Sequence, residues 1–150
     1  MTRPAFIAFG RLVTSRRLAA RRRVGATLVE FAIVAPVLLL LIFGMIEYGR
    51  LAMVQQVLTN ASREGARAAV LDGATTASVT SVVQSCLATG RVTGGNVTIT
   101  PNPISSAKFG DPITVRVQVT FDQVSWLPAP MYLSGKVLTG ATVMRRETIQ

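Results

Sequence analysis

The feature that most constrains this chain is an apolar run of sixteen residues, Phe31–Ile46, with the sequence FAIVAPVLLLLIFGMI and no charged side chain. At a rise of about 1.5 Å per residue the run forms roughly 24 Å of helix, and extension back to Ala26 gives roughly 32 Å, which matches a hydrocarbon core of about 30 Å. Pro36 lies inside the run, where a membrane helix tolerates proline better than a soluble helix does. We therefore predict a transmembrane helix over residues 26–46, with a buried core helix as the alternative.

Positive charge is concentrated immediately before this run. The chain has 16 Lys and Arg against seven Asp and Glu, and residues 1–25 contain seven of the arginines and no acid. Cytoplasmic flanks of membrane helices carry such an excess of basic residues. The sequence thus predicts a basic cytoplasmic leader at 1–25, a span at 26–46 and an extracytoplasmic domain at 47–150. The expected location is the cytoplasmic (inner) membrane, as a single-pass protein with its N-terminus inside.

Two kinds of targeting segment are alternatives to a span that the protein keeps. A secretory signal peptide needs small residues at a cleavage site just after its apolar run. The sequence found there, EYGRLAMV, lacks such a pattern, which favours a retained span. A mitochondrial transit peptide would account for residues 1–23, which are arginine-rich and acid-free.

A single carboxylate, that of Glu30, lies at the head of the apolar run. An ionised carboxylate costs about 2.5–3.5 kcal/mol near the centre of a bilayer and less near its edge, so it usually has a partner. A cut between Gly25 and Ala26 would create an N-terminal amine that could pair with the Glu30 carboxylate. Within one subunit Glu30 lies one turn away from this amine on a continuous helix. The amine of a neighbouring subunit is therefore the better partner. The alternative is that Gly25 is an ordinary small residue and that the carboxylate of Glu30 reaches water.

Residues 25–31, with the sequence GATLVEF, resemble the class III signal of type IV pilins and pseudopilins. Residues 25–50 resemble more specifically the TadE-type pseudopilins of the tight-adherence (Flp) pilus system. The glycine–glutamate pattern alone is weakly specific, and the arginine leader, the apolar run and the strings EYGR and REGAR make it specific. Further similarity extends over ASREGARAAVLDG (61–73), GDPITVRVQVTFDQV (110–124) and LTGATVMRRE (138–147).

The resemblance implies a processed assembly subunit. A prepilin peptidase would cut after Gly25, and the mature chain would begin at Ala26. Glu30 and Phe31 would serve assembly, with Glu30 paired to the N-terminal amine of a neighbouring subunit. The implied partners are the prepilin peptidase, other pilin-like subunits, the inner-membrane platform of the pilus and the lipid bilayer, and the product would act in pilus assembly or enter a surface pilus.

The residues after the apolar run predict an amphipathic helix that continues it to Leu71. Apolar and small side chains recur at alternating spacings of three and four, and Asp72-Gly73 supplies a stop. We expect the small residues of this face to pack on the chain's own sheet, with another protein element as the alternative. Glu47–Arg50 and Glu64–Arg67 are predicted to form i,i+3 pairs, which stabilise a helix slightly where they are exposed. The apolar face consists of Leu51, Val54, Leu58, Ala61, Gly65 and Ala68.

The rest of the chain completes an α+β fold of pilin type: a long N-terminal helix, a second short helix and a small antiparallel sheet of about three strands. The short helix is predicted over Thr75–Ala88, with Thr76 or Ser78 as its cap and Gly90 as its terminator. Period-two alternation predicts strands at 97–100, 113–121 and 136–145. The connection between the last two strands carries Trp126, Met131 and Tyr132, which we expect to cover the core rather than to form a surface for a partner.

Composition weighs against several classes of function. The chain has no histidine and one cysteine, which removes histidine-based triads, most zinc sites and an internal disulfide. We expect Cys86 to be a small buried residue, with an intermolecular disulfide as the alternative. The acids beyond the span have no spacing of a catalytic pair or a metal site; they are Glu64, Asp72, Asp111, Asp122 and Glu147.

These observations predict no enzyme, no cofactor, no metal and no small-molecule substrate. Nucleic-acid binding is suggested only by the net charge of +9, which the leader arginines explain better as a topology signal. The leading hypothesis is a minor, TadE-type pseudopilin that acts in pilus assembly. The alternative is an unprocessed single-pass anchor protein whose extracytoplasmic domain binds a ligand.

Overall fold

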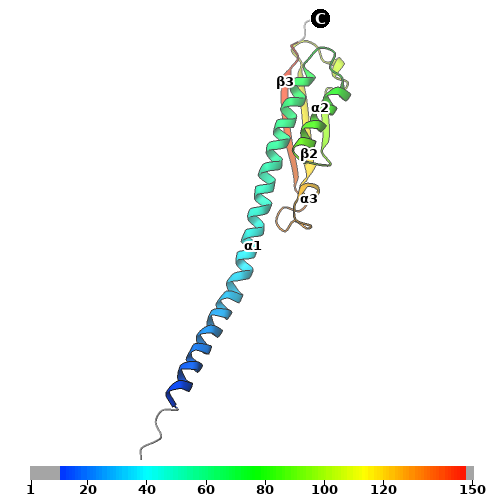
Figure 1. The fold of residues 1–150 in the computed structure, drawn as a ribbon. Helices are drawn as coiled ribbons and strands as arrows, with labels where there is room; N and C mark the ends of the chain where they lie inside the picture. The colour runs from blue at the N-terminus through cyan, green and yellow to red at the C-terminus, as the bar shows by residue number, and fades with distance from the viewer. Residues whose placement is uncertain (1–10, 148–150) are drawn as a thin grey trace, which may run out of the picture. The chain divides into compact units, whose positions relative to one another are not determined.

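The structure is a computed structural model that describes the backbone of residues 11–147, and the side-chain surroundings of Gly25 and of residues 27–147. Its elements confirm the predicted α+β class, with a long first helix, a second helix and three antiparallel strands (Figure 1). The chain divides by its contacts into two units, Met1–Ile42 and Phe43–Gln150. The elements are α1 (Arg11–Ala69), α2 (Thr76–Thr89), β1 (Asn96–Thr100), η1 (Ile104–Ser106), β2 (Pro112–Thr120), α3 (Phe121–Val124) and β3 (Val137–Arg145).

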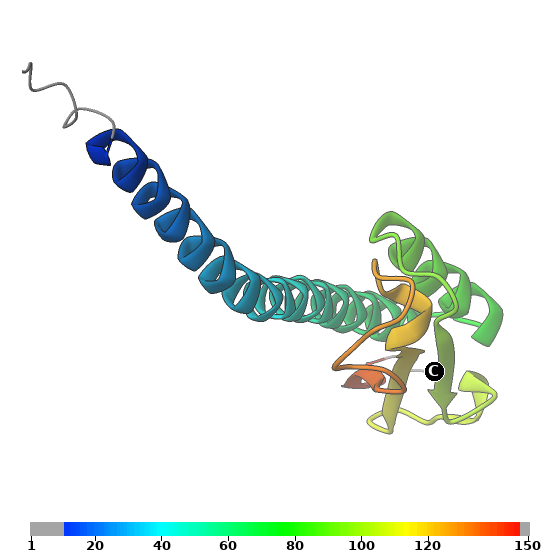
Figure 2. The ribbon, with the colours of Figure 1, turned by 90° about the horizontal axis from the view of Figure 1, so that it is seen from below.

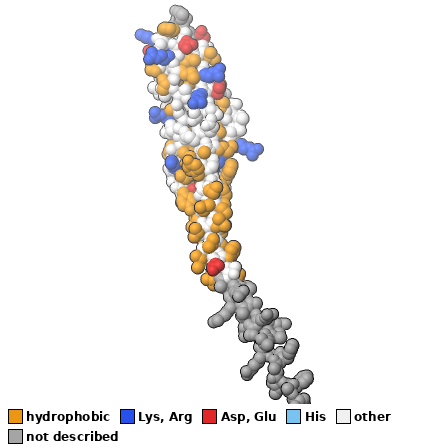
Figure 3. All heavy atoms as spheres, turned by 90° about the vertical axis from the view of Figure 1, so that its left-hand side faces the viewer, with side chains coloured by type: hydrophobic (Ala, Val, Ile, Leu, Met, Phe, Trp, Pro, Cys, Tyr) orange, Lys and Arg blue, Asp and Glu red, His pale blue; other side chains and the backbone are white. Residues whose placement is uncertain are grey.

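The first unit contains the apolar run of α1 as far as Ile42, and the last four residues of the run belong to the second unit. The large hydrophobic side chains of residues 28–41 are exposed, and the space-filling view shows them gathered on this stretch (Figure 3). Pro36 lies within the helix without ending it. The described residues contain one helix, Thr27–Ala69, that is long and apolar enough to cross a membrane by length and composition. The helix ends two residues before the predicted Leu71, and a turn follows in which Gly73 has a φ of +71°.

The second unit is a three-stranded antiparallel sheet in the order β1-β2-β3 with two helices on one face (Figure 2). Val117 at the centre of β2 pairs with Val97 of β1 and Gly140 of β3. The inward side chains of β2 meet the apolar faces of α1 and α2, as alternation along a half-buried strand requires. The buried core of these elements comprises Val54, Leu58, Ala61, Ala66, Ala69, Val79, Val83, Leu87, Ile113, Val115, Val117 and Val119.

Small residues allow α1 to approach the sheet closely, as the sequence predicted. A Cβ built on Gly65 would overlap Val83 of α2 and lie 3.1 Å from Val115 of β2. A Cβ built on Gly140 of β3 would lie 2.5 Å from the carbonyl oxygen of Leu58. Glycine at these two positions therefore sets the distance between α1 and the elements beneath it.

Two local predictions are wrong at the residue level. The cap of α2 is Thr75 rather than Thr76 or Ser78, because Thr75 has an extended backbone and its hydroxyl accepts from the backbone N–H of Ser78 at 3.1 Å. The second strand ends at Thr120 rather than at Phe121. The Phe121 N–H donates to the carbonyl of Lys136, and the chain turns into α3 at that point. Gly90 ends α2 as predicted, and Cys86 is half-buried against the core.

Candidate functional site

The predicted processing junction lies on α1 without a break in the helix. Gly25 is exposed, and a Cβ built on it would meet no heavy atom within 4 Å. Packing among the described residues therefore gives no reason for glycine at this position. Ala26 is helical, and its side chain lies outside the described part of the structure. The leader before Arg11 also lies outside the described residues.

Glu30 and Phe31 are presented outward on the same helix. The Phe31 side chain is 67% exposed, and Glu30 is also exposed. Within the part of the chain that the structure describes, no hydrogen bond or ion pair to the Glu30 carboxylate is present. Glu30 therefore heads an apolar helix whose flanking side chains, such as those of Leu28 and Val34, are more than half exposed.

A second group of polar residues lies at the other end of the apolar run and was not predicted. Glu47 is 1% exposed, although it follows directly after Ile46. Its Oε1 accepts from the backbone N–H of Met131, and its Oε2 accepts from those of Tyr132 at 3.0 Å and Leu133 at 3.2 Å. Successive backbone N–H groups that point into one concavity form an anion site, and here the anion belongs to the chain itself.

Arg50, one helical turn after Glu47, holds the start of the same connection. Its Nε donates to the carbonyl of Val124 at 2.7 Å, and one terminal nitrogen donates to the carbonyl of Arg91 at 3.2 Å. The Arg50 guanidinium carbon lies 5.0 Å from the centre of the Trp126 ring, within cation–π range. Burial lowers the pKa of the Arg50 guanidinium by desolvation.

The prediction that Glu47 and Arg50 form an i,i+3 pair is therefore wrong. Both side chains are buried, and both turn toward backbone groups of the connection between β2 and β3. Among the described residues the ion pair present is the other predicted one, Arg67 with Glu64 at 3.4 Å on the exposed surface. A helical spacing of three residues brings two charges close together, but backbone partners far along the chain compete for them.

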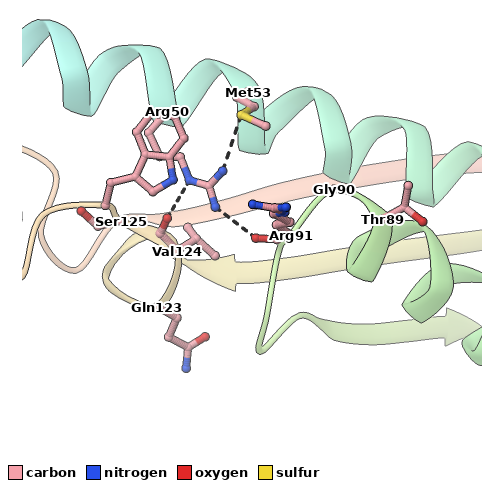
Figure 4. A pocket seen from close by; sticks show the side chains of 9 residues that line it. Arg50, Met53, Thr89, Gly90, Arg91, Gln123, Val124 and Ser125 are labelled. Carbon is pink, nitrogen blue, oxygen red and sulfur yellow. Dashed lines mark hydrogen bonds between the residues drawn. The ribbon is translucent and has the colours of Figure 1, made fainter.

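A pocket of about 530 Å³ opens beside Arg50, between α1, the end of α2 and the start of the connection (Figure 4). Figure 4 shows the Arg50 guanidinium reaching across it toward Val124 and Arg91. The wall combines the Trp126 ring with two arginines, Arg50 and Arg91, and with neutral polar and apolar residues. In the described residues no cluster of three or more potential metal-ligating side chains occurs.

The aromatic side chains of the connection do not cover the core, contrary to the sequence prediction. Trp126 is 65% exposed, Met131 is 55% exposed and Tyr132 is 57% exposed. The core beneath is filled instead by Phe121 and Val124 of α3. A Cβ built on Gly44 would lie 3.4 Å from the Tyr132 ring, so Tyr132 lies beside the last turn of the apolar run.

These features define a class of protein with one N-terminal apolar helix, which suggests a single-pass membrane anchor, and a small α+β domain. Residues 25–67 match the family described as TadE-like protein. This match confirms the predicted resemblance over these residues, and it supports a protein associated with the Tad pilus. The matched residues include the junction at Gly25, the apolar run, Glu47 and Arg50, and they end before the sheet. No curated protein and no solved structure matches the chain.

Proposed function

We propose that this protein is a minor, TadE-type pseudopilin that a prepilin peptidase cleaves after Gly25 and that acts in assembly of a tight-adherence (Flp) pilus. Residues 26–46 cross the inner membrane, the basic leader stays in the cytoplasm, and the domain from residue 47 onward lies outside. The carboxylate of Glu30 pairs with the N-terminal amine of a neighbouring processed subunit. Other pilin-like subunits and the inner-membrane platform are its partners.

The observation that carries this proposal is the junction itself. Gly25 occupies an open helical position where the described residues make no demand for glycine, so a requirement for it would come from a recognising enzyme. Glu30 is an exposed carboxylate among exposed apolar side chains, in a setting that favours a partner from outside the chain. Both residues lie in the segment that matches the TadE-like family.

Cleavage is tested by N-terminal sequencing and intact mass of the protein from native membranes that contain the peptidase. The expected mature chain begins at Ala26. Gly25→Leu should block cleavage, whereas Gly25→Ala should retain it because the side chain stays small. Gly49→Leu is the matched control, since Gly49 lies on the same helix with open space around it. A mature chain that keeps Arg21–Arg23 would refute processing and would favour an unprocessed anchor protein with a ligand-binding outer domain.

Pairing through Glu30 is tested by crosslinking to other pilin-like subunits and by the yield of surface pili. Glu30→Gln should leave insertion and cleavage intact and should lower both readouts, with Glu30→Asp intermediate because it keeps the charge at shorter reach. Glu64→Gln is the matched control, because Glu64 is an exposed acid on the same helix. Glu47→Gln is unsuitable as a control, since that carboxylate is buried and bonded. If Glu30→Gln assembles as well as the parent, the pairing mechanism is wrong.

A further inference from the structure

The segment Trp126–Leu133, with the sequence WLPAPMYL, is an irregular loop without a charged residue. The uncharged stretch extends from Gln123 to Gly135. Exposed loops are usually rich in polar side chains, yet this one exposes an indole, a thioether and a phenol. Its apolar side chains therefore face a medium that the structure does not itself supply.

The loop is fixed to α1 at a defined level. Glu47 binds the backbone of residues 131–133, and Arg50 binds Val124 and stacks beside Trp126. Tyr132 also lies against Gly44, which belongs to the apolar run. The loop is thus attached to α1 over the two turns that include and follow the end of this run at Ile46.

These two turns correspond to the polar layer of a bilayer. Headgroup and interfacial regions add about 5–8 Å on each side of the hydrocarbon core. At about 1.5 Å per residue this thickness spans roughly four or five helical residues, so with Ile46 at the hydrocarbon edge the layer covers residues 47–50. These are the residues that hold the loop.

The exposed side chains have the chemistry of this layer. Tryptophan and tyrosine concentrate at membrane–water interfaces, where an apolar ring and a polar tip are both accommodated. Tyr48 of α1 is 70% exposed and adds a second phenol at the same level as the loop. The buried carboxylate of Glu47 fits as well, because three backbone N–H groups replace the water that its burial excludes.

We propose that the loop Trp126–Leu133 is a membrane-interface element, in which Trp126, Met131 and Tyr132 insert among lipid headgroups around the end of the span. The loop and the apolar run then contact one continuous lipid surface. This inference rests on residues 26–46 crossing the bilayer and is independent of cleavage at Gly25 and of pairing through Glu30. The surface fits a phospholipid bilayer rather than a protein groove because Tyr132 lies beside Gly44, in the last turn of the apolar run.

The chain's only tryptophan provides the test, because Trp126 reports on the loop without any substitution. Full-length, uncleaved protein is reconstituted in phosphatidylcholine vesicles, and Trp126 emission is quenched by lipids with nitroxide at the headgroup, by lipids with nitroxide deep in the acyl chain, and by aqueous acrylamide. We expect headgroup nitroxide to remove most of the emission, with weaker effects from deep nitroxide and from acrylamide.

The matched control moves the indole to the other end of β2. In the double variant Trp126→Phe with Phe109→Trp, the indole replaces a side chain that is 67% exposed. Phe109 precedes β2 and Phe121 follows it, so the two ends are separated by roughly 30 Å at about 3.3 Å per residue. Emission from this variant should respond to acrylamide and not to labelled lipid.

Three outcomes would overturn the inference or its premise. Acrylamide quenching of Trp126 equal to that of the Phe109 variant, without quenching by headgroup nitroxide, would place the loop in water. Trp126 emission could instead be shielded from all three quenchers. If dilution of the protein with lipid then removes this shielding, the loop contacts another copy of the protein. Release of the protein from vesicles by alkaline carbonate would refute the span itself, which separates failure of the premise from failure of the loop's assignment.

Discussion

Replacing Glu47 by glutamine should loosen the connection between β2 and β3 while the sheet remains folded. The carboxylate accepts three backbone N–H bonds, and hydrogen bonds to charged groups contribute about 1.5–3 kcal/mol each. Glutamine keeps one acceptor oxygen, and its amide donor then faces the N–H groups that lost the other oxygen. Loss of one or two such bonds lowers the free energy of local opening by about 3 kcal/mol.

Amide hydrogen exchange of the full-length protein in detergent micelles measures this loss directly. A decrease of about 3 kcal/mol corresponds to roughly 100-fold faster exchange at the amides of residues 131–133, provided that they exchange by local opening. Amides in the centre of β2 should keep the parent rates. Glu64→Gln, which removes an exposed acid from the same helix, should leave the loop unchanged. Parent-like exchange of residues 131–133 in Glu47→Gln would refute the view that Glu47 fastens the loop.

Four further substitutions have expected outcomes. Arg50→Met should lose two hydrogen bonds to backbone carbonyls and lower thermal stability by about 2–4 kcal/mol, measured by circular dichroism, whereas unchanged melting would contradict its anchoring role. Gly140→Ala should lower the free energy of unfolding by about 1–3 kcal/mol, because the new Cβ meets the backbone of α1 at Leu58. Gly49→Ala, in open space on a helix, should raise it by about 0.5–1 kcal/mol. Equal melting temperatures of the two variants would be inconsistent with close packing at Gly140. Thr75→Ala should cost about 1 kcal/mol through loss of the α2 cap, and a loss no greater than that of an exposed threonine variant would argue against the capping box.

The sequence predicts the secondary structure well because each element has a strong local signal. The apolar run, the three-and-four spacing after it and the alternation along β2 each identify an element type by its own period. The errors fall at boundaries, where neighbouring choices are nearly equivalent. Thr75 and Thr76 are chemically alike as caps, and only the point at which the helix begins distinguishes them.

The junction at Gly25 is a prediction from sequence, which Gly25, Glu30 and the apolar run permit because they form a contiguous pattern. The burial of Glu47 and Arg50 could not be predicted, since their partners are backbone groups that lie 41 to 86 residues further along the chain. Backbone donors leave no mark in a sequence, so a spacing of three suggested a side-chain pair instead. The signal that was available is the uncharged stretch Gln123–Gly135, which is unusual for a loop directly exposed to water.

The hydrogen bonds from Met131, Tyr132 and Leu133 to Glu47 also determine when the domain can close during synthesis. Glu47 is made first, and its three backbone donors follow 84 to 86 residues later. Until Leu133 has been synthesised, the carboxylate must remain hydrated, and α1 cannot complete its contacts with the domain. Contacts of such long sequence separation slow folding. The fit between helix and loop is therefore a late event. A chain truncated before Met131 would lack all three donors and would leave the Glu47 carboxylate without them, directly after the apolar run.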